Sequence, residues 1–143
     1  MVERHNDLVT ILRGYQPDII LLPHPEDTNS DHSAVSDFAR FAVAGFLEAN
    51  PQKPPVILTY LIHYEAYPVP RGEDTEKILL PPAPLSDQGT GWFTLSLTEQ
   101  ERSNKKDALR SYFSQLRLMP GYLKSFARAN EIFLSCRLQT YKS

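Results

Sequence analysis

Two short segments most constrain how this chain folds. One is the apolar run Asp18–Leu22, and the other is Val56–Ile62, which is rich in β-branched residues. A continuous apolar run, unlike an alternating one, is typical of a strand covered on both faces, as in a parallel sheet. A helix connecting two such strands makes a right-handed crossover, which leaves the strands parallel. The runs therefore predict an α/β fold, with a mostly parallel sheet flanked by helices.

Helical periodicity flanks the two runs, over residues 3–14 and 33–49. The first helix is expected to stop at Gly14, and the second is expected to stop before the proline-rich segment 50–55. An N-cap for the second helix is expected from a polar side chain at its start: Ser30, Asp31 or Ser33.

The second half of the chain begins with a long stretch rich in proline, glycine and charge, residues 66–91. Loops of this length in compact domains often act as lids or binding loops. Residues 92–97 alternate like a half-buried strand, and Thr98 with Glu101 forms a capping box that starts a helix. Residues 122–133 predict a last amphipathic helix.

Composition narrows the class of protein. The 143 residues, 41% of them hydrophobic, predict one folded domain spanning residues 1–143. Because 15 basic and 17 acidic residues give a net charge of -2, nothing indicates a nucleic-acid surface. No run is long enough for a membrane helix, and the first residues do not resemble a signal peptide. The lone Cys136 forms no internal disulfide, so a cytoplasmic location is the default expectation.

The segment between the first apolar run and the second helix carries the chemistry. Open α/β sheets place their ligands beyond the carboxyl ends of the strands, where such loops converge. Six side chains here can bind a metal or move protons: His24, Glu26, Asp27, Asn29, Asp31 and His32. Imidazole is the commonest metal-binding side chain, and a nearby carboxylate fixes its tautomer. We therefore expect His32 to be a metal ligand, with Asp31 as a helix cap or as the group that orients it.

Other site residues have two interpretations each. His24 and Asp27 chelate a metal together with His32, in a mixed nitrogen and oxygen site that suits zinc, or they belong to a proline-shaped turn with solvated side chains. His63, at the end of the second run, lines the same cleft or is a buried histidine bonded to a backbone carbonyl. Arg71, in the long loop, meets an anionic substrate or is solvated.

Several segments occur in an order and spacing that cover nearly the whole chain: residues 4–13, Gln16-Pro17-Asp18-Ile19-Ile20, the acidic loop ending Asp31-His32, Tyr60-Leu61-Ile62-His63-Tyr64, Leu95–Thr98, Lys105 to Gln115, and Phe126 to Phe133. This pattern resembles the LmbE-like, or GlcNAc-phosphatidylinositol de-N-acetylase (PIG-L), superfamily of zinc-dependent N-deacetylases. The resemblance implies a Rossmann-like fold and hydrolysis of an N-acetyl group on a sugar or related amide. An N-acetylated sugar or glycoconjugate is then the expected partner, and Zn²⁺ the cofactor.

The resemblance also implies roles for individual residues. It makes His32 the third zinc ligand of the family and Asp31 its neighbour in the catalytic site. Many family members carry, three residues before this ligand, a histidine that helps to stabilise the oxyanion. Asn29 occupies that position here and offers a hydrogen bond without a positive charge. His63 and Arg71 are the candidates for binding substrate.

The chain departs from the family pattern at its N-terminal end. The family's His-Pro-Asp-Asp motif, which supplies two zinc ligands and the general base, ends a strand that precedes the helix at residues 3–14. The segment His24–Asp27 mimics this motif, but its surroundings fit the later one. We therefore expect the C-terminal part of a deacetylase, lacking its N-terminal strands and weakly active or inactive alone. An upstream segment or an oligomer partner would complete the sheet.

The sequence is also consistent with two other hypotheses about function. One is a degenerate module of the same fold that binds carbohydrate or another partner without metal. The other is an autonomous hydrolase that uses His24, Asp27 and His32 as its own site.

Overall fold

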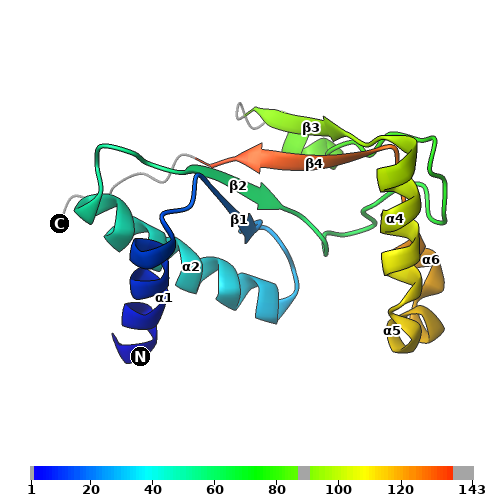
Figure 1. The fold of residues 1–143 in the computed structure, drawn as a ribbon. Coiled ribbons are helices and arrows are strands. Elements are labelled where there is room, and N and C mark those ends of the chain that lie inside the picture. Colours follow the sequence, from blue (N-terminus) through cyan, green and yellow to red (C-terminus); the bar gives the residue numbers. More distant parts are fainter. Residues whose placement is uncertain (1, 87–90, 137–143) are drawn as a thin grey trace. The chain divides into compact units, whose positions relative to one another are not determined.

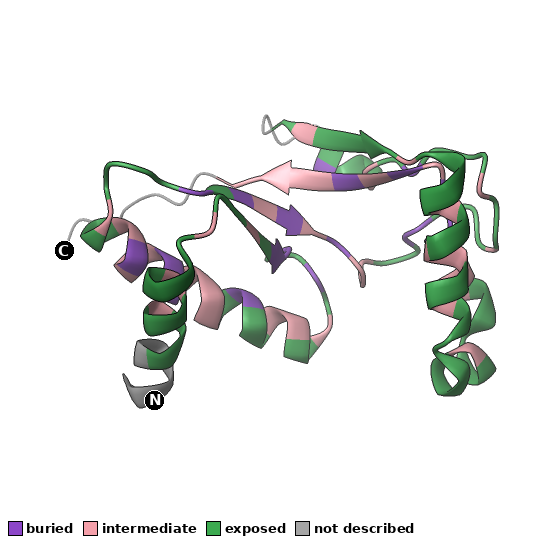
Figure 2. Cartoon of the chain, viewed as in Figure 1, coloured by how far each residue is buried: buried purple, intermediate pink, exposed green. Residues whose placement is uncertain are grey.

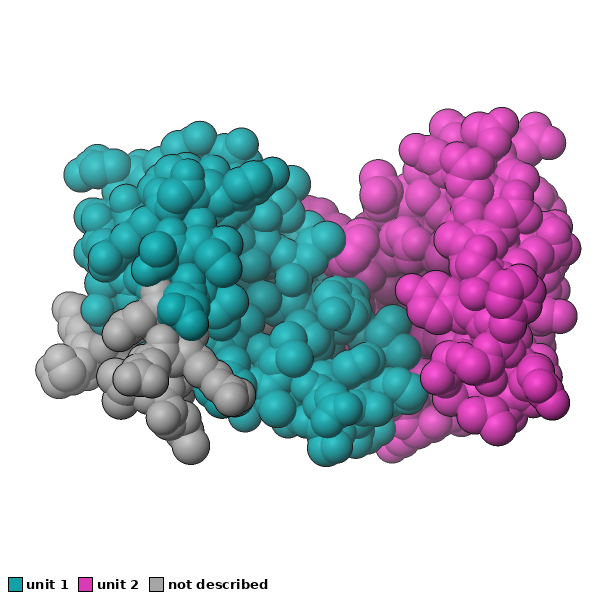
Figure 3. All heavy atoms as spheres, turned by 60° about the horizontal axis from the view of Figure 1, so that its bottom comes forward, with its two compact units in different colours: residues 1–63, 134–143 teal, residues 64–133 magenta. Residues whose placement is uncertain are grey.

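The computed structural model describes residues 2–86 and 91–136. The chain divides into two compact units, coloured separately in Figure 3: unit 1 comprises residues 1–63 and 134–143, and unit 2 comprises residues 64–133. The helices and strands follow one another in the order α1 (Val2–Tyr15), β1 (Ile19–Pro23), α2 (Ser30–Ala49), β2 (Val56–Tyr60), α3 (Ala83–Ser86), β3 (Trp92–Ser96), α4 (Glu99–Arg110), α5 (Phe113–Leu118), α6 (Pro120–Lys124) and β4 (Asn130–Ser135).

The strands form one mixed sheet in the order β1-β2-β4-β3. β1 and β2 pair in parallel, with Ile19 opposite Val56, as the two apolar runs predicted. β4 is antiparallel to β2, and Leu58 lies opposite Ser135. The α/β class is therefore confirmed, but the expectation of a mostly parallel sheet is wrong, because β1 and β2 are the one parallel pair among the described strands.

The antiparallel strand β4 replaces the end of the helix that was predicted over residues 122–133. α6 ends at Lys124, and β4 begins at Asn130. The Asn130 side chain bonds both backbone groups of Leu79, accepting from its N–H at 2.5 Å and donating to its carbonyl at 3.0 Å. Further along β4, Leu134 pairs with Thr59 of β2. Because these partners are far away in the sequence, helical periodicity in a local window was a misleading signal.

In unit 1, the helices α1 and α2 lie on the same side of β1 and β2 (Figure 1). Leu22, Val43 and Ile57 form the core between α2 and the strands, and all three are nearly fully buried. On the other face of β1, Ile19 and Leu21 are 57% and 52% exposed. The continuous apolar run of β1 had predicted burial on both faces, and that expectation is wrong because the described helices cover one face of an edge strand.

In unit 2, the buried guanidinium of Arg128 holds residues 70–74 of the long proline-rich loop. Arg128 is 1% exposed, and its two terminal nitrogens donate to backbone carbonyls of the proline-rich segment. Nη2 lies 2.6 Å from the carbonyl oxygen of Pro70, and Nη1 lies 2.9 Å from that of Gly72 and 3.4 Å from that of Asp74. Arg128 therefore gives residues 70–74 a fixed course although they lie outside any helix or strand.

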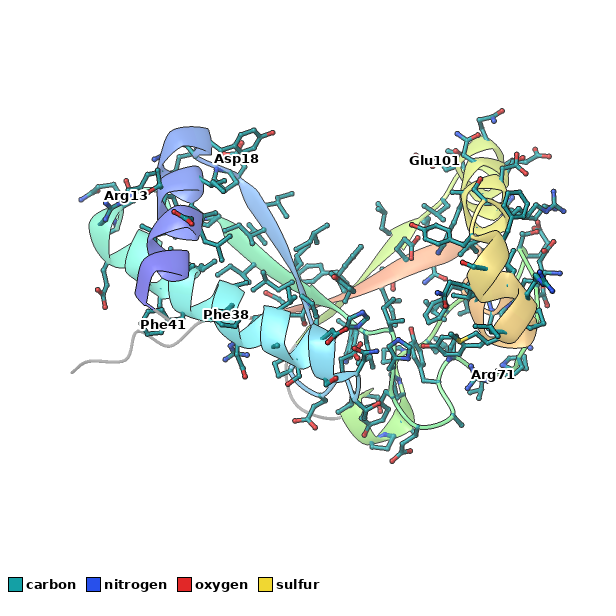
Figure 4. All side chains as sticks on the ribbon, turned by 90° about the horizontal axis from the view of Figure 1, so that it is seen from below. Arg13, Asp18, Phe38, Phe41, Arg71 and Glu101 are labelled. Carbon is teal, nitrogen blue, oxygen red and sulfur yellow. The ribbon has the colours of Figure 1, made fainter. Side chains whose placement is uncertain are left out.

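The capping box predicted at the start of α4 is confirmed (Glu101 is labelled in Figure 4). The Thr98 hydroxyl accepts from the Glu101 N–H at 3.3 Å, and the Glu101 carboxylate accepts from the Thr98 N–H at 2.7 Å. The carboxylate also accepts from the Thr98 hydroxyl at 2.8 Å, and the two bonds that it accepts lower the pKa of Glu101. In residues 2–86 and 91–136, no helix combines the length and apolar character needed to cross a membrane.

Candidate functional site

The loop between β1 and α2 is joined to the end of β2 by backbone hydrogen bonds. The His24 N–H donates to the carbonyl of Tyr60 at 2.7 Å, and the Thr28 N–H donates to the carbonyl of His63 at 2.8 Å. The Thr28 hydroxyl donates to the same carbonyl at 3.2 Å. Because β1 and β2 are parallel, their carboxyl ends lie at the same edge of the sheet, and these bonds bring the two following loops together there.

Asn29 is the N-cap that positions His32. Its side-chain Oδ1 accepts from the N–H of Asp31 at 2.9 Å and from that of His32 at 3.3 Å. α2 therefore begins at Ser30, and the caps expected at Ser30, Asp31 or Ser33 are wrong. Asn29 has extended backbone angles (φ -79°, ψ 125°), the conformation in which an N-cap side chain reaches the free amides of the first turn.

Asp27 is the most heavily bonded side chain of the loop. The residue is 4% exposed, and its Oδ1 accepts from the Asn29 N–H at 3.0 Å. Its Oδ2 accepts from the N–H groups of Ile62 and His63, both at 3.0 Å. Burial alone would raise the pKa of Asp27, but the bonds from His63, His32, Asn29 and Ile62 outweigh burial and lower it. Asp27 is thus a buried carboxylate that stays ionised at neutral pH.

His32 lies against this carboxylate. Its Nδ1 is 3.0 Å from Oδ2 of Asp27, and this nitrogen is shielded from solvent. The His32 side chain as a whole keeps 30% of its surface exposed. The ring of His63 is close by, with a centroid distance of 5.2 Å and an angle of 53° between the ring planes. Unit 1 therefore brings together three of the residues singled out from the sequence: Asp27, His32 and His63.

His24 and Asp27 are buried rather than solvated, so the solvated-turn interpretation does not describe them. Nδ1 of His24 accepts from the Glu26 N–H at 3.0 Å. Burial lowers the pKa of His24, and the nearby carboxylates of Glu26 and Asp27 offset part of this effect. Within the described residues, no group of three or more His, Cys, Asp or Glu side chains is arranged to hold a metal ion.

The remaining predicted site residues are Asp31 and Arg71. Asp31 is exposed in the first turn of α2. Arg71 (labelled in Figure 4) belongs to unit 2, where its guanidinium carbon lies 4.8 Å from the centre of the Tyr122 ring. Arg71 is exposed, in keeping with the solvated interpretation, and it also stacks on this ring.

Tyr60 is a residue that the sequence reasoning did not single out as part of this region. Burial first, and then the charge of Asp27, raise the pKa of its phenol. Its position as the last residue of β2 was the available signal, because that residue shares a sheet edge with the loop after β1. β1 also becomes more buried towards this edge of the sheet: Figure 2 shows that it begins exposed and ends buried where the loop starts.

Comparison of the chain with known protein families and with curated proteins finds no match.

Proposed function

We propose that this chain is part of a zinc-dependent N-deacetylase of the LmbE-like type, acting on an N-acetylated sugar or a related amide. The observation that carries the proposal is the placement of His32. It lies in the first turn of α2, just beyond the carboxyl end of β1, with Nδ1 3.0 Å from the buried carboxylate of Asp27. A histidine whose second nitrogen meets a carboxylate is the arrangement found around protein-bound zinc.

The residues present fit one ligand position of such a metal. His32 would hold the metal through Nε2, because Nδ1 faces Asp27. Asp27 already accepts three backbone N–H groups, and His24 accepts another, so both side chains are committed to the loop. The remaining ligands and the general base would come from outside this cluster. When bound, zinc polarises the acetyl carbonyl and lowers the pKa of the attacking water.

The neighbouring side chains then have distinct roles. The Asn29 oxygen caps α2, which leaves its amide N–H groups as donors for a developing oxyanion. Asp31, an exposed residue of the first turn of α2, would exchange protons with groups at the site. His63, 5.2 Å from His32 between ring centres, would bind substrate beside it.

The proposal includes a strand added beside β1. In the family's Rossmann-like sheet, further parallel strands come from the N-terminal part of the enzyme. β1 lies at the edge of the sheet and exposes Ile19 and Leu21, so its free edge and apolar face are suited to such an addition. The added strand would come from an upstream segment or from an oligomer partner.

The test is an activity assay on the chain with and without the missing motif. The chain would be extended at its N-terminus by a family segment that carries the strand and the His-Pro-Asp-Asp sequence. Release of free amine from an N-acetylglucosamine conjugate would then be measured with Zn²⁺ present. We expect release by the extended chain, loss of release in His32→Ala, and retention in Asp37→Ala, an exposed position of the same helix.

The other outcomes distinguish the alternatives. Amine release by the unextended chain, abolished by His32→Ala, would contradict the need for outside ligands and would favour the autonomous hydrolase. Elemental analysis would agree with that outcome if zinc were bound by the wild type and lost in His24→Ala. Absence of both zinc and amine release, with or without the extension, would overturn the deacetylase proposal in favour of a metal-free binding module.

A further inference from the structure

Three nitrogens lie 3.0 Å from a single oxygen of unit 1, Oδ2 of Asp27. Two of them are the backbone N–H groups of Ile62 and His63, each at 3.0 Å. The third is Nδ1 of His32, also at 3.0 Å. The other oxygen, Oδ1, accepts from the Asn29 N–H and thereby shapes the turn that leads into α2. One buried carboxylate therefore contacts the loop after β1, the loop after β2 and the first turn of the helix.

The backbone contacts leave the carboxylate no freedom to turn away from His32. Rotation of the side chain would break bonds to three amides, and a buried N–H without a partner costs about 1–3 kcal/mol. The carboxylate is ionised at neutral pH, since its pKa is lowered by these bonds despite burial. A fixed negative charge consequently faces Nδ1 of His32, and this nitrogen has no access to water.

This geometry selects one tautomer of the imidazole. A neutral imidazole has one protonated nitrogen and one nitrogen with a lone pair. At 3.0 Å from a carboxylate oxygen, a lone pair on Nδ1 would meet another lone pair, whereas an N–H on Nδ1 would meet an acceptor. The proton therefore belongs on Nδ1, and the lone pair is left on Nε2, at the opposite side of the ring from Asp27.

We propose that Asp27 is a positioning residue that holds His32 in the Nδ1–H tautomer, so that Nε2 presents its lone pair for a ligand. Asp27 does not itself contact the ligand. Its use for catalysis rests on the function proposed above, in which His32 binds zinc. The tautomer itself depends only on the contacts of this chain.

The decisive experiment is long-range ¹H–¹⁵N NMR of the full chain with ¹⁵N-labelled histidine. The spectra would be recorded without metal at about pH 8.5, well above the ordinary imidazole pKa. The His32 signals would be assigned by their loss in His32→Gln. We expect the wild-type pattern to be that of a protonated Nδ1 and an unprotonated Nε2. A wild-type spectrum showing the Nε2–H form, or the mixture seen for free imidazole, would overturn the proposal without any Asp27 variant.

Asp27→Ala sharpens the test, because it removes the acceptor that faces Nδ1 of His32. An amide at this position would not, since its oxygen would stay on the N–H groups of Ile62 and His63 and still face Nδ1. We expect Asp27→Ala to lose the preference for the Nδ1–H form, whereas the matched control Asp31→Ala, which removes a neighbouring, exposed carboxylate, should leave the wild-type pattern unchanged. An unchanged pattern in a folded Asp27→Ala variant would show that Asp27 does not set the tautomer.

Zinc titration separates this proposal from the proposed function. If His32 binds zinc, Asp27→Ala should weaken binding by roughly 10- to 100-fold, and Asp31→Ala should weaken it far less. A correct tautomer without zinc binding would uphold the positioning role of Asp27 and count against the deacetylase. Zinc binding through His32 that is unaffected by Asp27→Ala would support the zinc site but count against the positioning role of Asp27.

Discussion

Two buried charged side chains, Asp27 in unit 1 and Arg128 in unit 2, hold proline-containing loops by opposite chemistry. The Asp27 carboxylate accepts from backbone N–H groups of three residues. The Arg128 guanidinium donates to backbone carbonyls, among them those of Pro70 and Gly72. In both cases a formal charge is stable in the interior because the backbone supplies the hydrogen bonds that water would otherwise supply.

The difference between the two lies in what else each charge touches. Asp27 also meets the ring of His32, a side chain that can bind a metal or change its protonation state. Every hydrogen bond that the structure gives the Arg128 side chain goes to a backbone carbonyl, including that of its neighbour Ala127. The comparison indicates that Arg128 serves the fold, whereas Asp27 serves the fold and the site together.

The largest effect is expected from Arg128→Met, which keeps an unbranched apolar stem but removes the donors of the guanidinium. The carbonyls of residues 70–74 would lose their partners, so we expect the free energy of unfolding to fall by about 3 kcal/mol. Urea denaturation measures this change. Arg128→Lys is the matched control, because it keeps the charge but cannot span several carbonyls, and it should lose less. A loss below about 1 kcal/mol for Arg128→Met would break the comparison.

A smaller loss, about 2 kcal/mol, is expected from Asp27→Asn, because the bonds from the backbone amides to a charged oxygen become bonds to a neutral one. The exposed control Asp31→Asn should change stability by no more than about 0.5 kcal/mol. Urea denaturation of the two variants and the wild type measures both changes. Equal effects of the two substitutions would mean that burial and bonding of Asp27 do not matter for the fold.

Low pH should destabilise the loop held by Asp27 more than the loop held by Arg128. The pKa of His24 is lowered from 6.5 by burial, so the unfolded state takes up the proton first. The stability of the loop is then complete above pH 6.5 and falls as the pH drops below that value. The lowered pKa of Asp27 adds a further loss below pH 3.8. An arginine stays charged across this range, so the loop held by Arg128 should be less sensitive.

Hydrogen exchange followed against pH measures this difference at the amides of His63 in unit 1 and Gly72 in unit 2. His24→Asn is the control, since its side-chain oxygen can replace Nδ1 as the acceptor for Glu26 but does not titrate. It should flatten the pH dependence above pH 4. Equal acid sensitivity of the two amides would contradict the assignment.

Asn29→Ala tests how the site depends on its helix cap. The first-turn N–H groups of Asp31 and His32 would lose their acceptor, and we expect a loss of about 1 kcal/mol in urea denaturation. Asn29→Ser, which can also cap, should restore most of it. A cap at Ser30 or Ser33 would instead make Asn29→Ala neutral.

The smallest effect is expected for Arg71→Ala. Its guanidinium stacks on Tyr122 at an exposed position, and such a contact is worth about 0.5–1 kcal/mol. Tyr122→Leu should remove the same contact, so a double-mutant cycle of the two measures it directly. A coupling near zero would show that the stacked position of Arg71 contributes nothing to stability.

Much of the candidate site was visible in the sequence because it depends on local order. The apolar strand β1, the polar loop and the helix α2 follow one another within 31 residues, and the side chains at the loop could be named in advance. Which acid of that loop contacts His32 could not be predicted. Glu26 and Asp27 are adjacent acids, and only the folded chain shows that Asp27 is the buried one that meets His32.

The sequence by itself determined the parallel pair β1–β2, the helix between these strands and the capping box at Thr98, because short-range patterns of apolar and polar residues specify them. Only the tertiary structure decided that β4 is a strand, that Arg128 is buried, and that Asp27 faces Nδ1 of His32. Each of these depends on backbone groups distant in the sequence, such as the amide of Ile62 for Asp27 and the carbonyl of Pro70 for Arg128. A local pattern carries no information about which distant backbone groups a buried charge will meet.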